Sequence, residues 1–323
     1  MNVVKITKES GIPLIGVIQF GIIDRRTNLI QIRPTTYCNL KCKFCSTSAG
    51  VHPVEYEVEL NYLIEWVKHV IKLKECDEME ANIDSVGEPS TYPNLIELIK
   101  ELNKIKEIKF ISMQTNGTLL TKEKIKELEK AGLNRINMSI HSLDENTAKA
   151  LADVHFYNIK KIIEIAKFIK KTKIELNLTP VYIPNINDEE IPKLIYLAKQ
   201  LNCNILIQKY EVYKYSKKIK KAKDITWYNF YKKLEEWEKE FNIKLKYGHF
   251  KFNIKKTKPL EKVFEINDII PVKIMLPGWY KNQMIASSRG RLITILDCSK
   301  SLNSKIRVKI ISNDNNIYLA KTL

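Results

Sequence analysis

Long apolar runs are missing from this chain of 323 residues. A membrane-spanning helix needs about 20 consecutive apolar residues. The nearest candidate, Ile12–Ile23, is shorter and is interrupted by proline, glycine and glutamine. The first ten residues also lack the apolar core of a signal peptide. We therefore expect no membrane partner and a cytoplasmic location.

Cysteine is also scarce, with six residues in the chain. A structural zinc site needs four ligands, usually as two Cys or His pairs, but Cys76, Cys203 and Cys298 stand alone in the sequence. Disulfides are not expected in a reducing compartment. The other three cysteines are close together, in Cys38-Asn-Leu-Lys-Cys42-Lys-Phe-Cys45. Three thiolates at this spacing can surround one corner of an iron–sulfur cluster, although a zinc site or unrelated buried thiols remain alternatives.

The Cys-x3-Cys-x2-Cys pattern, with Phe44 before its last cysteine, resembles the cluster signature of the radical S-adenosylmethionine (radical SAM) superfamily. The resemblance implies that Cys38, Cys42 and Cys45 bind a [4Fe-4S] cluster and leave one iron open for S-adenosylmethionine (AdoMet). Reductive cleavage of AdoMet would then give a 5'-deoxyadenosyl radical. It also implies an electron donor such as ferredoxin or flavodoxin.

Further motifs resemble the AdoMet-binding elements of that superfamily. Val86-Gly87-Glu88-Pro89 is similar to the Gly-Gly-Glu-Pro motif that holds the methionine amino group, with Val86 in place of the first glycine. Thr115-Asn116-Gly117 resembles the element near the ribose and carboxylate, and Ser139 precedes a Ser-Leu-Asp element. The implied cofactor-binding residues are Phe44, Gly87, Glu88, Thr115, Asn116, Ser139 and Asn177.

The segment containing Asn177 and Thr179 resembles the molybdenum-cofactor enzymes that rearrange GTP. Those enzymes bind a second cluster through three C-terminal cysteines, and only Cys298 is present here, so the resemblance does not extend to their activity. The catalytic residue stays unknown, with His141 and Cys298 as candidates. A histidine at a strand end and a lone cysteine are more often structural.

Strands alternate with amphipathic helices from residue 29 onward, which predicts a parallel α/β sheet. Six β/α units match the partial (β/α)6 TIM-type barrel that the resemblance implies. We expect an N-terminal β-hairpin extension at residues 1–29, the barrel with a linker and helix at 30–245, and a small β domain at 261–323. The expected helices are 57–74, 93–102, 121–131, 157–171, 188–201 and 227–241, and the expected strands of the first two domains are 29–33, 79–85, 108–114, 135–141, 174–181 and 204–208.

The C-terminal part reads as five short strands, at 272–275, 283–287, 292–296, 306–311 and 317–320. This predicts a small β-barrel, and the segment resembles the end of a TRAM or OB-type RNA-binding domain. Such a tail occurs on superfamily enzymes that modify RNA, but it could also be a lid. Its expected positive face comprises Lys281, Arg289, Arg291, Lys300, Lys305, Arg307 and Lys309.

A net charge of +17 favours a polyanionic partner, although lysine enrichment can also reflect genome composition or a hot habitat. The segment Lys214–Lys223 combines lysines with Tyr213 and Tyr215, which can neutralise phosphates and stack on bases. A solvated linker is the alternative. The stripe of Trp227, Phe230, Tyr231, Leu234 and Trp237 in the following helix is expected to be core.

These patterns predict a radical SAM enzyme that modifies a nucleotide in tRNA or rRNA. The alternative is a radical SAM enzyme acting on a small molecule or a partner protein, with the C-terminal domain as a lid. A third interpretation is a cluster-bearing RNA-binding or redox-sensing protein without AdoMet chemistry. The bond formed, the reductant and the oligomeric state are left open.

Overall fold

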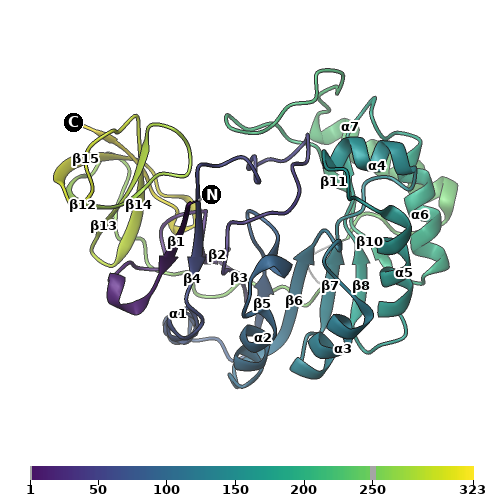
Figure 1. The fold of residues 1–323 in the computed structure, drawn as a ribbon, viewed down its shortest axis with the longest axis horizontal. Coiled ribbons are helices and arrows are strands. Elements are labelled where there is room, and N and C mark those ends of the chain that lie inside the picture. The colour runs from purple at the N-terminus through teal and green to yellow at the C-terminus, as the bar shows by residue number, and fades with distance from the viewer. Residues whose placement is uncertain (1, 248–251) are drawn as a thin grey trace. The chain divides into compact units, whose positions relative to one another are not determined.

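The computed structural model describes residues 2–247 and 252–323, and its helices and strands are shown in Figure 1. Contacts along the backbone divide the chain into two units. Unit 1 comprises Met1–Tyr37, His52–Ile111 and Ile254–Leu323, and unit 2 comprises Cys38–Val51 and Ser112–Asn253. Each unit is therefore built from segments that are distant in the sequence.

Unit 1 contains three strands of the main sheet in the order β5-β3-β2. β2 (Gly21–Asp24) and β3 (Leu29–Arg33) form an antiparallel hairpin, and β3 runs parallel to β5 (Met79–Ile83). The expected first strand, 29–33, is thereby confirmed, but the hairpin pairs this strand with β2 and does not lie within residues 1–29 as expected. The unit also contains α1 (Leu60–Lys74) and α2 (Leu95–Asn103), whose buried leucines, isoleucines and valines recur at helical spacing.

A second, two-stranded sheet in unit 1 was not predicted. β1 (Asn2–Ile6) runs parallel to β4 (Val54–Val58). The expected helix from residue 57 begins only at Leu60, because Glu57 and Val58 pair with β1. β4 reads Val-Glu-Tyr-Glu-Val, an alternation that suits a strand.

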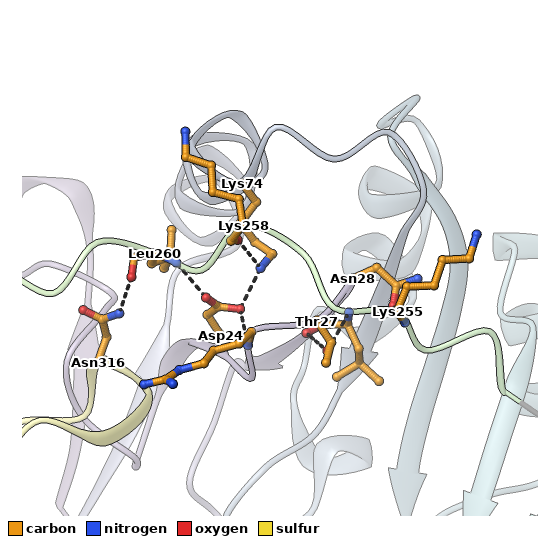
Figure 2. Close-up of polar contacts among 10 residues, drawn as sticks. Asp24, Thr27, Asn28, Lys74, Lys255, Lys258, Leu260 and Asn316 are labelled. Carbon is orange, nitrogen blue, oxygen red and sulfur yellow. Dashed lines mark hydrogen bonds and ion pairs between the residues drawn. The ribbon is translucent and has the colours of Figure 1, made fainter. Parts of the chain in front are cut away.

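The segment that leads to the C-terminal domain is fastened to the β2–β3 hairpin of the same unit (Figure 2). The carboxylate of Asp24 accepts from the ammonium group of Lys74 at 2.7 Å and from the backbone N–H of Leu260 at 2.8 Å. Asn28 and Lys255 exchange two further hydrogen bonds, at 2.8 and 2.9 Å. Asp24 and Lys74 are both almost completely buried, so the connection contains a desolvated ion pair.

The C-terminal domain is a closed barrel in the order β12-β13-β14-β16-β15. Its core includes Val272, Ile274, Ile293, Ile295, Val308 and Ile310. The strand count agrees with the sequence prediction, and the likeness to a TRAM or OB-type domain stays a prediction. The strands are β12 (Ile269–Pro277), β13 (Gln283–Ser288), β14 (Arg291–Leu296), β15 (Lys305–Ser312) and β16 (Leu319–Thr322).

The N-terminal segment of unit 1 lies directly against β14. The backbone N–H of Leu292 donates to the carbonyl of Ile15 at 2.8 Å, and the N–H of Tyr318 donates to that of Gly16 at 2.9 Å. A side chain at Gly16 would bring a Cβ to 2.1 Å from the Leu292 carbonyl oxygen, and its φ is +127°. Glycine is therefore required at this close approach.

Unit 2 contains the parallel strands β7 (Arg135–Met138), β8 (Glu175–Leu178) and β10 (Asn204–Ile205), and β7 pairs with Ser112–Thr115 of β6 (Ile108–Thr115). The strand order β10-β8-β7-β6-β5-β3-β2 agrees with the expected partial barrel fold. Two short strands, β9 (Val181–Tyr182) and β11 (Gln208–Lys209), pair separately. The helices are α3 (Lys122–Ala131), α4 (Glu145–Ala152), α5 (Ile159–Ile169), α6 (Glu190–Gln200) and α7 (Trp227–Phe241).

Three sequence predictions in unit 2 need correction. α4 was missed, although Asp144 caps it by accepting from the N–H of Thr147 at 2.8 Å. α6 begins at Glu190 and not at the expected residue 188, where the Asp188 carboxylate accepts from the Tyr182 hydroxyl. On α7, Phe230, Leu234 and Trp237 are buried, but Trp227 and Tyr231 are exposed. Among the described residues, no helix combines the length and apolar content needed to span a bilayer.

Candidate active site

The three expected cluster ligands, Cys38, Cys42 and Cys45, lie on one loop of unit 2 and are partly exposed. We call residues 38–51 the cysteine loop. Two of its backbone N–H groups donate to the carbonyl oxygens of Leu151 and Ala152, at 2.9 and 3.1 Å. The loop is therefore anchored on the end of α4, which gives this unpredicted helix a role in positioning the site.

The sulfur of Cys45 has two polar neighbours. The N–H of Ala49 donates to it at 3.3 Å, and the Thr47 hydroxyl oxygen lies at 3.3 Å. Hydrogen bonds to sulfur stabilise and tune iron–sulfur clusters, so this donor set fits such a cluster. Among the described residues, no three His, Cys, Asp or Glu side chains are close enough to hold a metal ion. The three sulfurs must therefore turn toward one another to share a cluster.

Asn39, within the cysteine motif, links the cysteine loop to the Thr-Asn-Gly turn after β6. Asn116 donates its side-chain N–H to Asn39 Oδ1 at 3.0 Å, and Asn39 donates to Thr118 Oγ1 at 2.8 Å. The hydroxyl of buried Thr115 accepts from the N–H of Gly117 and shapes the turn. Two predicted elements thus meet in unit 2, through an asparagine that the sequence analysis did not single out.

Gln114 joins the ends of three neighbouring strands. Its side-chain nitrogen donates to Ser139 Oγ at 2.8 Å and to Thr179 Oγ1 at 2.9 Å. Ser139 follows β7 and Thr179 follows β8, so both hydroxyls lie at the carboxyl ends of parallel strands, where α/β barrels place their active sites. Gln114 was also missed, although it is a polar residue in a largely buried strand.

Asn177, in contrast, is buried within the sheet. Its amide nitrogen donates to Asn137 Oδ1 at 2.9 Å, and its amide oxygen accepts from Asn204 at 2.9 Å. This asparagine ladder crosses β7, β8 and β10. Its role as a cofactor contact stays a prediction.

Phe44 and His141 pack against each other in unit 2. Their ring centroids are 4.6 Å apart in an edge contact, and Phe44 also joins a buried cluster with Ile183 and Tyr210. Burial lowers the pKa of His141 to about 4, so the ring is neutral at neutral pH. Its Nδ1 accepts from the N–H of Val181 at 3.0 Å, which assigns the ring proton to Nε2.

Glu190 holds the loop that follows Ser139. Its Oε2 accepts from the Ser142 hydroxyl and from the N–H groups of Leu143 and Asp144, at 2.7 to 2.9 Å. Burial by itself raises the pKa of Glu190, but hydrogen bonds from Lys193, the Asp144 N–H, Ser142 and Leu143 outweigh it and lower the pKa to about 2. The loop is therefore fixed by the buried carboxylate of Glu190. From the sequence, this residue was expected only to be part of a helix.

Gly87 and Glu88 lie in unit 1. A Cβ at Gly87 would be 2.2 Å from the Thr36 carbonyl oxygen and 2.3 Å from that of Tyr37, so only glycine allows this packing. The buried Glu88 carboxylate accepts from the backbone N–H and the hydroxyl of Ser90, at 3.0 and 2.6 Å. These bonds fix the orientation of the carboxylate.

Cys298, the second catalytic candidate, lies in the hydrophobic core of the C-terminal barrel in unit 1. It is 2% exposed and packs in the same cluster as Phe264 and Tyr318. This is the ordinary environment of a buried thiol that acts as a small apolar side chain.

Residues 211–226, called here the basic strap, lie on the cysteine loop within unit 2. The N–H of Lys217 donates to the Cys45 carbonyl at 3.0 Å, and Ser48 Oγ donates to the Tyr215 carbonyl at 2.6 Å. Ser216 Oγ donates to the Ser46 carbonyl at 2.9 Å, and the Lys217 ammonium donates to the Lys41 carbonyl at 2.7 Å. The predicted lysine and tyrosine tract is thus attached to the loop that carries the cysteines.

The partial barrel and the three-cysteine loop define a class of α/β enzyme with an iron–sulfur site. The sequence profile of the radical SAM superfamily matches residues 32–198. The chain belongs to the radical SAM superfamily. Its cofactors are accordingly a [4Fe-4S] cluster and AdoMet, and an electron donor and a substrate complete the reaction.

Comparison with known proteins finds relatives that match different shares of the chain. The chain is 38% identical to "Uncharacterized protein MJ0103" of Methanocaldococcus jannaschii, over 98% of this chain and 82% of that protein. It is 32% identical to GTP 3',8-cyclase of Clostridium botulinum, over 54% of each chain. The chain therefore spans about half the length of that enzyme.

Among solved structures, Streptococcus suis SuiB bound to S-adenosylmethionine matches with a TM-score of 0.53. The match has 20% sequence identity and covers 76% of this chain and 51% of SuiB. At this identity the likeness concerns the fold.

Proposed function

We propose that Cys38, Cys42 and Cys45 hold the [4Fe-4S] cluster and that the motifs at residues 87–88, 115–116 and 139, with Phe44 and Asn177, bind AdoMet. With both cofactors bound, the available chemistry is reductive cleavage of AdoMet to a 5'-deoxyadenosyl radical, which removes a hydrogen atom from the substrate. A ferredoxin or flavodoxin is the proposed electron donor.

The chain's own residues bind and orient the reactants. Glu88, fixed by Ser90, would accept from the ammonium group of AdoMet. Gln114 holds the Ser139 hydroxyl in place. The Asn39–Asn116 bond keeps the cysteine loop in register with the turn after β6. Neutral His141 presents an N–H group at Nε2 as a hydrogen-bond donor and stays the candidate for handling a proton.

We propose further that the substrate is a nucleotide in tRNA or rRNA. The observation that carries this step is the basic strap, which places lysines and tyrosines on the cysteine loop through four hydrogen bonds. Lysines neutralise phosphates and tyrosines stack on bases. A strap of this composition at the cluster loop supports delivery of a nucleic acid to the radical chemistry. A base within a duplex would have to leave its stack first.

The C-terminal barrel contributes charge to the same partner in this proposal. Lys305, Arg307 and Lys309 on β15 are exposed on one side of the strand. Arg291, which was expected on the positive face, is only 9% exposed. OB-type domains bind oligonucleotides on the face of their second and third strands, and here the third strand, β14, lies against the chain's own residues 15–16. The proposed barrel contact is therefore to phosphates on β15.

A second candidate substrate is a free nucleotide. The similarity to GTP 3',8-cyclase over about half of the chain favours it. One triphosphate can pair with only a few lysines, so a free nucleotide would leave the other lysines of the basic strap without a role. The reaction would require polymeric RNA if the first candidate is the substrate, and it would not if the second is.

The test is an anaerobic assay of the reconstituted protein with dithionite and AdoMet. The additions compared are total RNA from a strain that lacks the gene, the same RNA digested to nucleosides, and GTP. The products measured are 5'-deoxyadenosine and the nucleoside mass spectrum, and a Cys45→Ala variant is the control.

Polymer-dependent 5'-deoxyadenosine with a new nucleoside mass is the expected result. Stimulation by GTP and not by RNA would replace the RNA proposal with the second candidate. Turnover that ignores both would direct the search to a partner protein or another metabolite. No 5'-deoxyadenosine under any condition would contradict the proposed enzyme chemistry.

A further inference from the structure

The start of α7 exposes three large aromatic side chains. Trp227, Tyr228 and Tyr231 are 51%, 77% and 47% exposed, whereas Phe230 and Leu234 on the same helix are buried. Aromatic side chains bury a large apolar area when they pack, and exposed apolar groups that gather together mark interaction sites. The helix therefore has a packed face and a separate aromatic face that the core does not use.

The exposed rings are arranged for stacking. The Trp227 and Tyr231 rings are 5.8 Å apart with an interplanar angle of 28°. The Lys209 ammonium lies 5.2 Å from the centroid of Trp227, which is a cation–π distance. The cation therefore lies over the face of the Trp227 ring, and the neighbouring Tyr228 and Tyr231 rings stay exposed for a base to stack on.

The segment from β11 to the start of α7 carries charge of one dominant sign. Residues 209–233 contain nine lysines, against the acidic residues Glu211 and Asp224. An apolar protein partner would find no compensation for so many cations, whereas a polyanion with exposed bases satisfies both the charge and the rings. Duplex RNA hides its base faces, so the rings favour a single strand.

The aromatic face is connected to the cysteine loop within unit 2. Lys209 belongs to β11, and the next residue, Tyr210, accepts through its hydroxyl from the N–H of Ile219 in the basic strap at 3.3 Å. The strap in turn bonds the cysteine loop. Figure 1 shows α7 and β11 in the same part of this unit.

We propose that Trp227, Tyr228 and Tyr231, with Lys209 and the lysines of the basic strap, form a stacking platform for single-stranded RNA. The platform holds the strand beside the reactive nucleotide, so one part of the RNA is stacked while another is presented to the site. This inference rests on the proposed RNA substrate and adds the site that selects single strands.

The experiment measures fluorescence anisotropy of a labelled 12-nucleotide single-stranded RNA of mixed sequence, titrated with the full-length reconstituted protein. The variants are Trp227→Ala/Tyr231→Ala, the conservative Trp227→Phe/Tyr231→Phe, and Tyr196→Ala. Tyr196 is 59% exposed on α6 and lies outside the platform, so it is a matched control for loss of a surface tyrosine. A duplex of the same sequence is the competing ligand.

The alanine pair is expected to weaken binding about 10-fold to 100-fold, because each base stacked on an aromatic ring contributes strongly to affinity. The phenylalanine pair and Tyr196→Ala should bind within about twofold of the unchanged protein, since one keeps the rings and the other lies elsewhere. Duplex RNA should bind more weakly than the single strand, and bound RNA should quench Trp227 fluorescence.

Unchanged affinity of the alanine pair would overturn the platform, as would equal binding of the duplex. Circular dichroism of each variant separates loss of binding from loss of folding. If RNA is modified although the alanine pair binds normally, the platform fails and the RNA function stands. If binding depends on Trp227 but no nucleoside changes, the platform stands and the RNA-modifying function fails.

Discussion

Two basic surfaces, one in each unit, have similar charge but different chemistry. On the barrel of unit 1, exposed cations face each other across strands: Lys273 lies opposite Lys305, and Lys309 lies opposite Lys321. In unit 2 the strap lysines are interleaved with exposed aromatic rings. In the described part of residues 254–323, the large exposed apolar side chains are aliphatic. Positive charge alone therefore does not identify a site that recognises bases.

The two surfaces are also held differently. The segment before the barrel is fastened by the buried Asp24–Lys74 pair, whereas the strap is attached by hydrogen bonds at the surface. Removing one partner of a buried pair is strongly destabilising, and surface hydrogen bonds contribute about 1 kcal/mol each. We infer that the barrel is a permanent part of unit 1 and that the strap can open on the cysteine loop.

The largest effect is expected from replacing a cysteine, because a substitution in the cysteine loop and one in the barrel core should have opposite outcomes. Cys45→Ala should remove cluster iron and abolish 5'-deoxyadenosine formation, because the proposed ligand is lost and Fe–S clusters depend on cysteine sulfur. Cys298→Ala, in the barrel core, should retain both. Iron and sulfide analysis with product quantification checks this, and a fully loaded Cys45→Ala protein would contradict the proposed ligand set.

The next effect tests how the barrel is fastened. Lys74→Met leaves the buried Asp24 carboxylate without its cation and should lower the free energy of unfolding by about 3–5 kcal/mol. Lys72→Met, two residues away on the exposed side of α1, should change it by less than about 0.5 kcal/mol. Urea unfolding measures both. Equal stability of the two variants would show that the pair does not fasten the segment.

Unit 2 also contains a buried charged side chain, Glu190, which should contribute to stability. Glu190→Gln should lower stability by about 2 kcal/mol near neutral pH, because hydrogen bonds to an ionised carboxylate are stronger than those to a neutral amide. The folded pKa is about 2 and the unfolded value is about 4.3. The stabilisation is therefore present above about pH 4.3 and is lost as the pH falls toward 2.

Urea unfolding of the unchanged protein and the Glu190→Gln variant, from neutral pH down to about pH 3, checks this dependence. Glu189→Gln, at the exposed neighbouring position, is the control. A stability difference that did not shrink with falling pH would contradict the assigned role of the ionised carboxylate.

A smaller effect compares the two basic surfaces directly. Replacing Lys218, Lys220 and Lys221 of the strap by alanine, or Lys305, Arg307 and Lys309 of β15, should each weaken RNA binding about 10-fold and reduce its salt dependence. Only the strap variant should also reduce RNA-stimulated 5'-deoxyadenosine formation, since the strap bonds the cysteine loop. Equal turnover losses would remove the distinction between the surfaces.

The sequence predicted the regular parts of this molecule well. Alternating strands and helices, the three-cysteine loop and five C-terminal strands follow from periodicity and local motifs. The predictions failed where contacts between residues far apart in the sequence determine the structure. Asn39, Gln114 and Glu190 bond partners 46 to 79 residues away in most of their contacts, and no local pattern shows such pairs. The exposure of Trp227 and Tyr231 was missed because an apolar helical stripe predicts burial.

The smallest expected effect concerns the opening of the strap. Ser216→Ala removes the bond to the Ser46 carbonyl and, within the strap, the bond that the hydroxyl accepts from the Tyr213 N–H. Loss of the bond to the cysteine loop should shift the strap toward its open form by about 1 kcal/mol, or about fivefold. Trypsin should then cut within Lys217–Lys223 about fivefold faster, because cleavage follows the population of the open form. Cleavage after Lys300 in the barrel is the internal control. If both sites accelerate equally, the substitution has loosened the whole protein. If neither does, the strap is held by the remaining contacts and behaves as the barrel does.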